Sequence, residues 1–115
     1  GLNRLVLAEG LVFAEGLGLD IASFLPVLKR SPAYSVAMDV KGEKMVTGDF
    51  RPQSRVVQHL KDLSIVKKYA DQIGQELPLT EVHMKIMEAA VAAGDGEKDN
   101  SVVIQELRRR RWDSQ

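Results

Sequence analysis

The chain has 115 residues, enough for one domain with a buried core. Its 16 basic and 16 acidic residues balance, so no overall field favours nucleic acid or an anionic membrane, and we expect neither as a partner. The absence of cysteine excludes disulfides, thiolate metal sites and cysteine nucleophiles, and two histidines are too few for a histidine-based metal site. Charged residues interrupt the apolar run 2–19, which also lacks the features of a signal peptide, so we expect a cytoplasmic protein.

Residues 1–18 predict a helix whose apolar side chains lie nearly all round its axis, as in a helix covered by several others. Gly10 and Gly16 each cost about 1 kcal/mol in helix propensity, and we expect closely packed neighbours to compensate. Glu9 is expected to be a paired charge between helices. The sequence opens inside this helix without a capping residue or an initiator methionine. Because a central helix rarely begins a chain, we expect a fragment whose missing part is N-terminal.

The next two predicted helices are short. Asp20 is expected to cap a helix over 21–30, which contains Pro26. A further helix runs to about Val40, and Gly42 either ends it or is carried within it.

Residues 51–74 form the longest clearly amphipathic stretch, with Ser54 as the expected N-cap and Gly74 as a left-handed stop. Six apolar residues recur at steps of three and four and make one stripe: Val56, Leu60, Leu63, Val66, Ala70 and Ile73. Lys61 lies beside this stripe. A lysine in that place is either solvated or faces an anionic ligand at the edge of a cleft, and the residues alone leave both interpretations open.

The C-terminal third predicts two more helices. Thr80 is expected to cap the first, which places His83 near its start as a surface residue, and Gly94 ends it. The last helix spans about 101–110, with Asp99 or Ser101 as its cap.

The arginine run 108–111 is expected to be a solvated, partly frayed terminus. No period-two alternation predicts a strand, so the domain is expected to be all-α with about six helices. The sequence contains no glycine-rich phosphate loop and no local signature of a catalytic triad.

Four motifs cover almost the whole chain: AEGLVFAEGLGLD at 8–20, SPAYS at 31–35 with GEKMVTGDFRPQ at 42–53, HLKDLSIVKKYA at 59–70, and LPLTEVHMKIMEAAVAAGDGEKDNS at 77–101. In this order they resemble the C-terminal helical domain of the β-hydroxyacid dehydrogenases, the family of 3-hydroxyisobutyrate dehydrogenase, tartronate semialdehyde reductase and the glyoxylate/succinic semialdehyde reductases. The stretch from Phe50 to Leu63 is the most specific part of the match.

The resemblance implies a helical bundle like the C-terminal domain of 6-phosphogluconate dehydrogenase. It implies that residues 1–115 are one all-α C-terminal domain without its N-terminal Rossmann domain. The complete enzyme is expected to oxidise a β-hydroxyacid, or reduce the matching semialdehyde, with NAD or NADP bound mainly by the missing domain. The resemblance also implies a homo-oligomer, most simply a dimer.

The resemblance carries few site residues onto this chain. The family's catalytic lysine and asparagine lie upstream of residue 1, so no catalytic residue is assigned, and this fragment alone is predicted to be inactive. Lys61 matches the lysine that reaches the bound cofactor from the facing domain. Phe50, Tyr34 and Ser35 are candidates for lining the cleft, although packing or capping explains each of them as well. No residue is assigned to a metal.

The alternative hypothesis is a non-catalytic helical module. In that case Lys61 is ordinary surface, and the arginine run 108–111 binds an acidic partner.

Overall fold

The computed structural model describes residues 1–111, which contain six α-helices and one 3₁₀ turn and no strand. The all-α prediction is therefore confirmed for the described part of the chain. The elements in order are α1 (Leu2–Gly16), α2 (Ile21–Lys29), α3 (Val36–Thr47), α4 (Val56–Ile73), α5 (Pro78–Ala92), η1 (Asn100–Val102) and α6 (Val103–Arg108).

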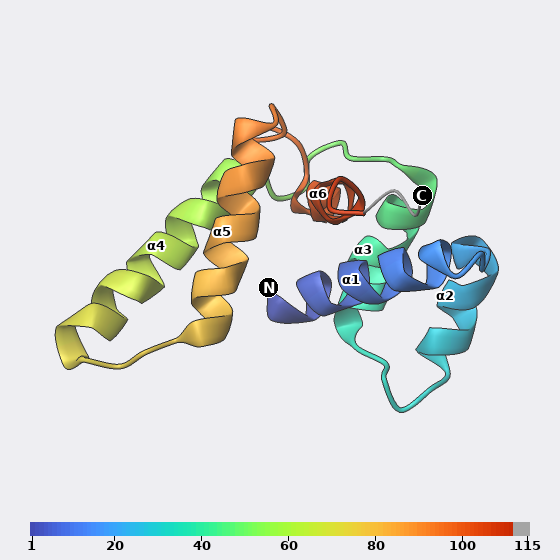
Figure 1. The fold of residues 1–115 in the computed structure, drawn as a ribbon, viewed down its shortest axis with the longest axis horizontal. Helices are drawn as coiled ribbons and strands as arrows, with labels where there is room; N and C mark the ends of the chain where they lie inside the picture. The colour runs from blue at the N-terminus through green and yellow to red at the C-terminus, as the bar shows by residue number, and fades with distance from the viewer. Residues whose placement is uncertain (112–115) are drawn as a thin grey trace.

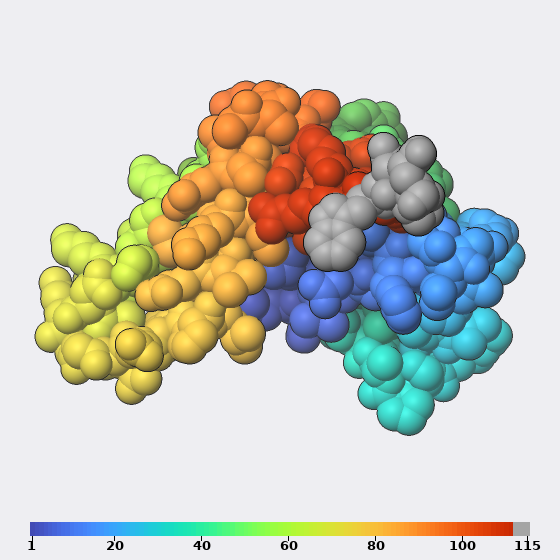
Figure 2. Space-filling model, in the orientation of Figure 1, coloured from blue at the N-terminus to red at the C-terminus, as the bar shows by residue number. Residues whose placement is uncertain are grey.

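Helix α1 lies at the centre of the fold, where it packs against α2, α3, α5 and α6. Helices α4 and α5 form a hairpin that projects to one side of the remaining helices (Figure 1), and the same arm is visible in the space-filling view (Figure 2). The first residue of α1 points toward this hairpin (Figure 1). The core joins α1 to every other helix through fully buried side chains that include Leu11, Leu25, Met45, Met87 and Ile104.

The prediction that α1 is covered on most sides is correct for one face only. Leu7, Ala8 and Leu11 are buried, whereas Phe13 is 69% exposed. Glu9 is exposed and takes part in none of the ion pairs among residues 1–111, so its predicted pairing is wrong. Glu15 makes such contacts instead, as described below.

Gly42 lies within α3, which continues seven residues beyond the predicted end at Val40. A Cβ atom at this position would lie 2.8 Å from Cδ2 of Leu25, so only glycine lets α2 and α3 pack this closely. The Asp20 side chain accepts a hydrogen bond from the N–H of Ala22, which confirms it as the cap of α2.

The predicted cap of α4 is wrong, because the helix begins after Arg55 without any side-chain cap. Its first free N–H groups are satisfied by the loop before η1: Val56 donates to the carbonyl of Lys98 and Val57 to that of Gly96. Gly74 has φ 70° and ends the helix as predicted.

The stripe predicted along α4 is only partly covered. Val56 and Ala70 are buried, whereas Val66 is 46% and Ile73 80% exposed. Helix α4 packs mainly against α5, and the rest of the fold reaches only its N-terminal end (Figure 1).

The predicted start of α5 and the predicted exposure of His83 are both wrong. The helix begins two residues before Thr80, with Pro78 in its first turn, where the missing proline N–H has no cost. His83 is consequently in the second turn and is 1% exposed, because it faces α1.

The last helix follows a 3₁₀ turn, and Asp99 caps this turn through the N–H of Ser101. Arg109, Arg110 and Arg111 are exposed, as expected of the arginine run, but each guanidinium of the run binds a carboxylate. Arg108 makes two hydrogen bonds of 2.9 Å to Glu15 of α1, and Arg111 adds a third of 3.2 Å. Arg109 and Arg110 bind the carboxylates of Asp95 and Glu106.

Candidate cofactor-facing site

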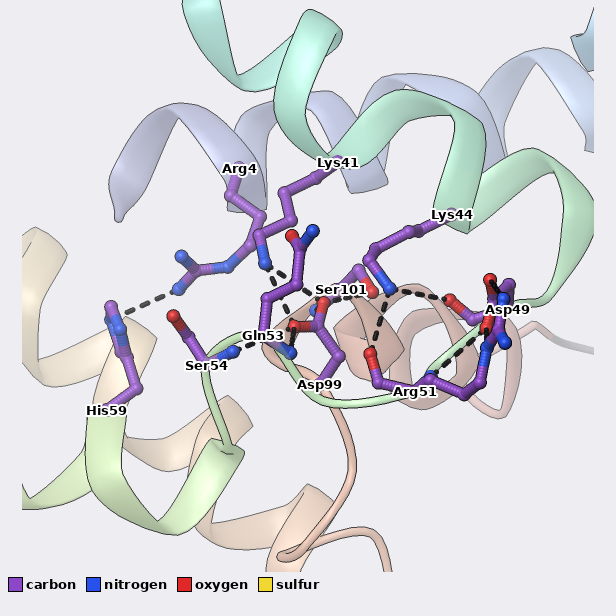
Figure 3. A network of polar contacts seen from close by, with 10 residues as sticks. All are labelled: Arg4, Lys41, Lys44, Asp49, Arg51, Gln53, Ser54, His59, Asp99 and Ser101. Atoms are coloured by element: carbon purple, nitrogen blue, oxygen red, sulfur yellow. Dashed lines mark hydrogen bonds and ion pairs between the residues drawn. The ribbon is translucent and has the colours of Figure 1, made fainter.

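Asp99 organises the loop that leads into α4 (Figure 3). Its fully buried carboxylate accepts hydrogen bonds from the backbone N–H groups of Gln53 at 2.9 Å and Ser54 at 3.0 Å. It also accepts from the N–H and the hydroxyl of Ser101. The loop conformation is therefore fixed by a residue almost fifty positions further along the chain.

Lys41 of α3 supplies the counter-charge to Asp99, with Nζ 2.9 Å from Oδ1 and 3.1 Å from Oδ2. Both side chains are buried. Burial alone would raise the pKa of Asp99, but the hydrogen bonds from Ser101, Ser54, Gln53 and Lys41 together hold this pKa far below its usual range. Asp99 is ionised at neutral pH, and α3, the loop and the start of η1 are held together by one charge.

Lys44, one turn further along α3, braces the other end of the loop. Its Nζ donates to the backbone carbonyls of Asp49 at 3.4 Å and Arg51 at 2.8 Å. The carboxylate of Asp49 binds the guanidinium of Arg51 through two bonds of 2.9 Å (Figure 3).

Arg4 joins α1 to both helices of the hairpin. Its Nη2 lies 3.1 Å from Nε2 of His59 on α4 and 3.3 Å from Nε2 of His83 on α5. The two imidazole rings are 5.1 Å apart. Because each Nε2 must accept from the guanidinium, both imidazoles are neutral and carry their proton on Nδ1.

The pKa values of the two histidines agree with the neutral state. Burial, and after it the positive charge of Arg4, lowers the pKa of both His59 and His83 to about 4. Arg4 is 7% exposed, and it forms no ion pair with a carboxylate among the described residues. Burial lowers the pKa of Arg4 as well, while the charge of Asp99 raises it.

A polar hollow of about 340 Å³ lies between the loop and the first turns of α4. It is lined by Pro52, Gln53, Ser54, Arg55, Val57, Gln58, His59 and Asp62. His59 thus connects the Arg4 cluster to this hollow. The hollow offers amide, hydroxyl and imidazole groups, which can orient a polar ligand by hydrogen bonds.

Lys61 is exposed on α4, two residues after His59, and it does not line the hollow itself. It enters no ion pair or side-chain hydrogen bond within residues 1–111. Its ammonium group is consequently available to a ligand that approaches this side of α4.

The other predicted residues lie elsewhere. Phe50 is half-buried and packs against the core, and its carbonyl accepts from the N–H of Asp99. Tyr34 and Ser35 line a separate hollow of about 290 Å³ beside α1. The Tyr34 hydroxyl donates to Asp39. These residues and Lys61 do not share one pocket.

Sequence reasoning missed Arg4, His59, His83 and Lys41 as site-forming residues. Each sits on a helix where a polar side chain is ordinarily solvated, and no local spacing distinguishes it. The one available signal was the match of Asp99 and Ser101 to a family motif. Within residues 1–111 no three histidine, cysteine or acidic side chains are grouped so that they could hold a metal ion. No helix in this part is long and apolar enough to cross a bilayer.

The described residues thus form an all-α domain with a polar hollow beside the start of α4 and an exposed lysine on the same helix. The model of the family described as "NAD-binding of NADP-dependent 3-hydroxyisobutyrate dehydrogenase" matches residues 1–107. The chain belongs to this family, and the cofactor of the family is NAD or NADP.

Individual proteins agree with the family assignment. A probable mitochondrial 3-hydroxyisobutyrate dehydrogenase-like protein of Arabidopsis thaliana is 33% identical over 95% of this chain and 35% of its own length. The 2-hydroxy-3-oxopropionate reductase of Escherichia coli K12 is 29% identical over 92% of this chain and 36% of its own. A crystal structure of 3-hydroxyisobutyrate dehydrogenase from Salmonella typhimurium superposes with a TM-score of 0.85 at 27% identity, covering 89% of this chain and 36% of that one. The chain therefore spans about a third of the length of these relatives.

The residues of the hollow fit part of a dinucleotide. Gln53, Ser54 and Gln58 can hydrogen-bond ribose hydroxyl or carboxamide groups, and Lys61 can approach a phosphate or ribose oxygen. The sequence contains no glycine-rich phosphate loop.

Proposed function

We propose that this chain is the C-terminal helical domain of an NAD(P)-dependent β-hydroxyacid dehydrogenase, in which it forms one wall of the cofactor and substrate cleft. The reaction is hydride transfer between a β-hydroxyacid, such as 3-hydroxyisobutyrate, and the dinucleotide. The match of residues 1–107 to the family and the coverage of about a third of its relatives support this domain assignment. The Rossmann domain and the family's catalytic lysine and asparagine belong to the remainder of that enzyme.

The single observation that carries the proposal is the Arg4–His59 hydrogen bond, because it fixes the start of α4 against the first turn of α1. In the family that this chain resembles, the catalytic residues lie on the same long helix as α1, further upstream. The contact fixes the orientation of α4, which carries Lys61, relative to α1. The cofactor, when bound, supplies or accepts the hydride, and Lys61 holds a negatively polarised group of the cofactor with its ammonium.

Phe50, Tyr34 and Ser35 remain proposed cleft-lining residues, with Phe50 the closest of them in sequence to the polar hollow. We also propose a homo-oligomer and a cytoplasmic location. No observation favours the alternative module that binds an acidic partner, because all four guanidinium groups of 108–111 already bind carboxylates of this chain.

The test is the Lys61→Ala variant in the complete enzyme, with Lys68→Ala as the matched control. Lys68 is an exposed lysine of the same helix that lies two turns away, beside a hollow between α4 and α5. Loss of one charge-assisted hydrogen bond costs about 1.5–3 kcal/mol. We expect KM for the cofactor to rise roughly 10- to 100-fold in Lys61→Ala and to stay unchanged in Lys68→Ala. Equal kinetics in both variants would remove Lys61 from the site.

The domain assignment has an independent test in the gene. The reading frame that encodes residues 1–115 is expected to encode, upstream, a G-x-G-x-x-G fingerprint after a strand. A reading frame without it contradicts the dehydrogenase proposal.

A further inference from the structure

The Arg4 cluster, which consists of Arg4, His59 and His83, joins α1 to the α4–α5 hairpin. Within residues 1–111 its two hydrogen bonds are the only ones between α1 and the hairpin. The hairpin otherwise projects away from the other helices (Figure 1), and its far end carries exposed apolar side chains, with Ile73 at 80% and Leu79 at 67% exposure. The tilt of this far part relative to α1 therefore depends on the Arg4 cluster.

The base of the hairpin is anchored separately. Three apolar residues of α5 are buried in the core: Ile86, Met87 and Ala90. The N-terminal end of α4 is held by backbone hydrogen bonds to the loop before η1. None of these contacts uses a titratable side chain. Loss of the Arg4 hydrogen bonds therefore leaves the hairpin attached at its base and frees the part that lies beyond the two histidines.

The Arg4 hydrogen bonds require both imidazoles to be neutral. A guanidinium has only donors, so each Nε2 must accept, and a protonated imidazole has no acceptor nitrogen. Protonation of either ring therefore sets two donors against each other, at contacts that are now 3.1 and 3.3 Å long. It also places a second positive charge beside a guanidinium that is only 7% exposed.

The charges around the two rings are mostly positive. Burial first, and then the charges of Arg4 and of the Gly1 amino group, lower the pKa of both imidazoles. Asp62 of α4 acts the other way, on the α4 imidazole alone. Asp99, just before η1, acts on Arg4 but is already paired with Lys41 of α3. An added proton in this cluster thus meets net repulsion.

We propose that the Arg4 cluster is a proton-sensitive joint: protonation of His59 or His83 releases the α4–α5 hairpin from α1, while the helices and the base of the hairpin stay intact. Release changes the tilt of α4 and, with it, the position of Lys61 relative to α1. The movement itself does not depend on the dehydrogenase proposal. Its consequence, a weaker binding of the cofactor in acid, rests on that proposed function.

The size of the effect follows from the pKa values of the two rings. Each imidazole titrates at about 4 when it is bound to Arg4 and at 6.5 when it is free, so acid favours the released hairpin. Between pH 7 and pH 5 the ratio of released to bound hairpin is expected to rise roughly tenfold for each histidine.

The experiment measures the distance between two spin labels in the 115-residue chain as a function of pH. The chain has no cysteine, so labels can be attached through Val27→Cys on α2, where the valine is 51% exposed, and Ile73→Cys at the far end of α4. Pulsed electron paramagnetic resonance is expected to give one narrow distance distribution at pH 7. At pH 5 and below a second, broader population is expected to grow, with the helical circular dichroism unchanged.

The variant His59→Gln/His83→Gln keeps an acceptor oxygen for each Arg4 hydrogen bond but cannot take up a proton. It is expected to keep the narrow distribution from pH 7 to pH 4.5. Asp71→Asn/Glu81→Gln is the control, because it removes the carboxylates that form ion pairs within the hairpin. The control is expected to release the hairpin over the same pH range as the wild type.

A measurement on the unmodified chain does not require any variant to fold. Nitrogen-15 NMR of the imidazoles at pH 7 is expected to show both rings protonated on Nδ1. An Nε2–H tautomer in either ring overturns the proposal, and so does a wild-type distance distribution that stays unchanged down to pH 4.5. Equal release in the double-glutamine variant, or loss of helical dichroism together with the change in distance, overturns it as well.

The complete enzyme tests the consequence for the cofactor. KM for the cofactor is expected to rise between pH 7 and pH 5 in the wild type and to rise less in the double-glutamine variant. Identical pH profiles would show that the joint does not act on the cofactor site. Failure of the dehydrogenase proposal is recognised separately, because Lys61→Ala is compared with its control at pH 7, where the hairpin is bound to α1.

Discussion

The buried pair of Lys41 and Asp99 is expected to contribute more to the stability of this fold than any other single polar contact described here. The Asp99→Asn variant keeps the size of the side chain but removes its charge. In the structure five donor contacts converge on this carboxylate: Lys41 Nζ, the N–H groups of Gln53, Ser54 and Ser101, and the Ser101 hydroxyl. An asparagine offers one acceptor oxygen and directs an NH₂ group at some of these donors.

The magnitude follows from burial. Lys41 is 7% exposed, so the variant leaves a buried ammonium without its counter-charge. Breaking a buried ion pair from one side costs about 3–5 kcal/mol. Since a domain of this size has roughly 5–15 kcal/mol of stability in total, Asp99→Asn is expected to bring it close to unfolding at room temperature.

Urea unfolding followed by circular dichroism at neutral pH measures the loss, with the midpoint expected to fall and the slope to stay unchanged. Adding Lys41→Met to Asp99→Asn is expected to recover part of the stability, because it removes the unpaired cation. Asp49→Asn is the control: its partner Arg51 has a side chain that is 88% exposed, and the change is expected to cost less than about 1 kcal/mol. The reasoning is refuted if Asp99→Asn costs no more than this control, or if Lys41→Met makes it worse.

Two further predictions concern packing and pH. Gly42→Ala is expected to destabilise the chain by about 1–3 kcal/mol, because its Cβ would lie 2.8 Å from a Leu25 methyl carbon; an unchanged unfolding midpoint would show that α2 moves aside freely. His59 and His83 have pKa values of about 4 in the folded chain and 6.5 in the unfolded chain, so the unfolded state binds protons first. The free energy of unfolding therefore falls as the pH falls from 6.5 through 4. We expect a loss of about 1–3 kcal/mol between pH 7 and pH 5, and replacement of both histidines by glutamine is expected to flatten this slope; a slope that persists in the double variant would assign it to other groups.

The helices and several of their boundaries could be predicted from sequence because their signals are local. Asp20 satisfies an N–H two residues away, and Gly74 adopts a left-handed conformation within its own turn. The apolar residues of α1 likewise indicated a helix, although only one of its faces is covered. In each case the interaction that decides the structure spans a few positions, so a short window contains it.

Several predictions failed because contacts between distant segments decide the structure there. Ser54 has the right side chain for a cap, but its backbone N–H is bound by Asp99, and the 96–98 loop satisfies the helix end instead. The ion pairs of Arg108 and Arg111 were not predicted, because their partner Glu15 lies more than ninety residues away. Charge and periodicity in one window cannot indicate which distant carboxylate will meet a guanidinium.

The candidate site shows the same dependence most clearly. Arg4 stands in an apolar helix and His83 in an ordinary amphipathic one, and neither has any local property of a site residue. They are joined only because the N-terminal end of α1 lies against the α4–α5 hairpin, which brings a guanidinium to two imidazoles. Figure 3 shows the contact with His59. That junction also sets the position of Lys61, two residues beyond His59, relative to α1. A family motif could therefore single out Lys61 as a candidate from sequence, whereas the contacts that position α4 follow from the tertiary structure alone.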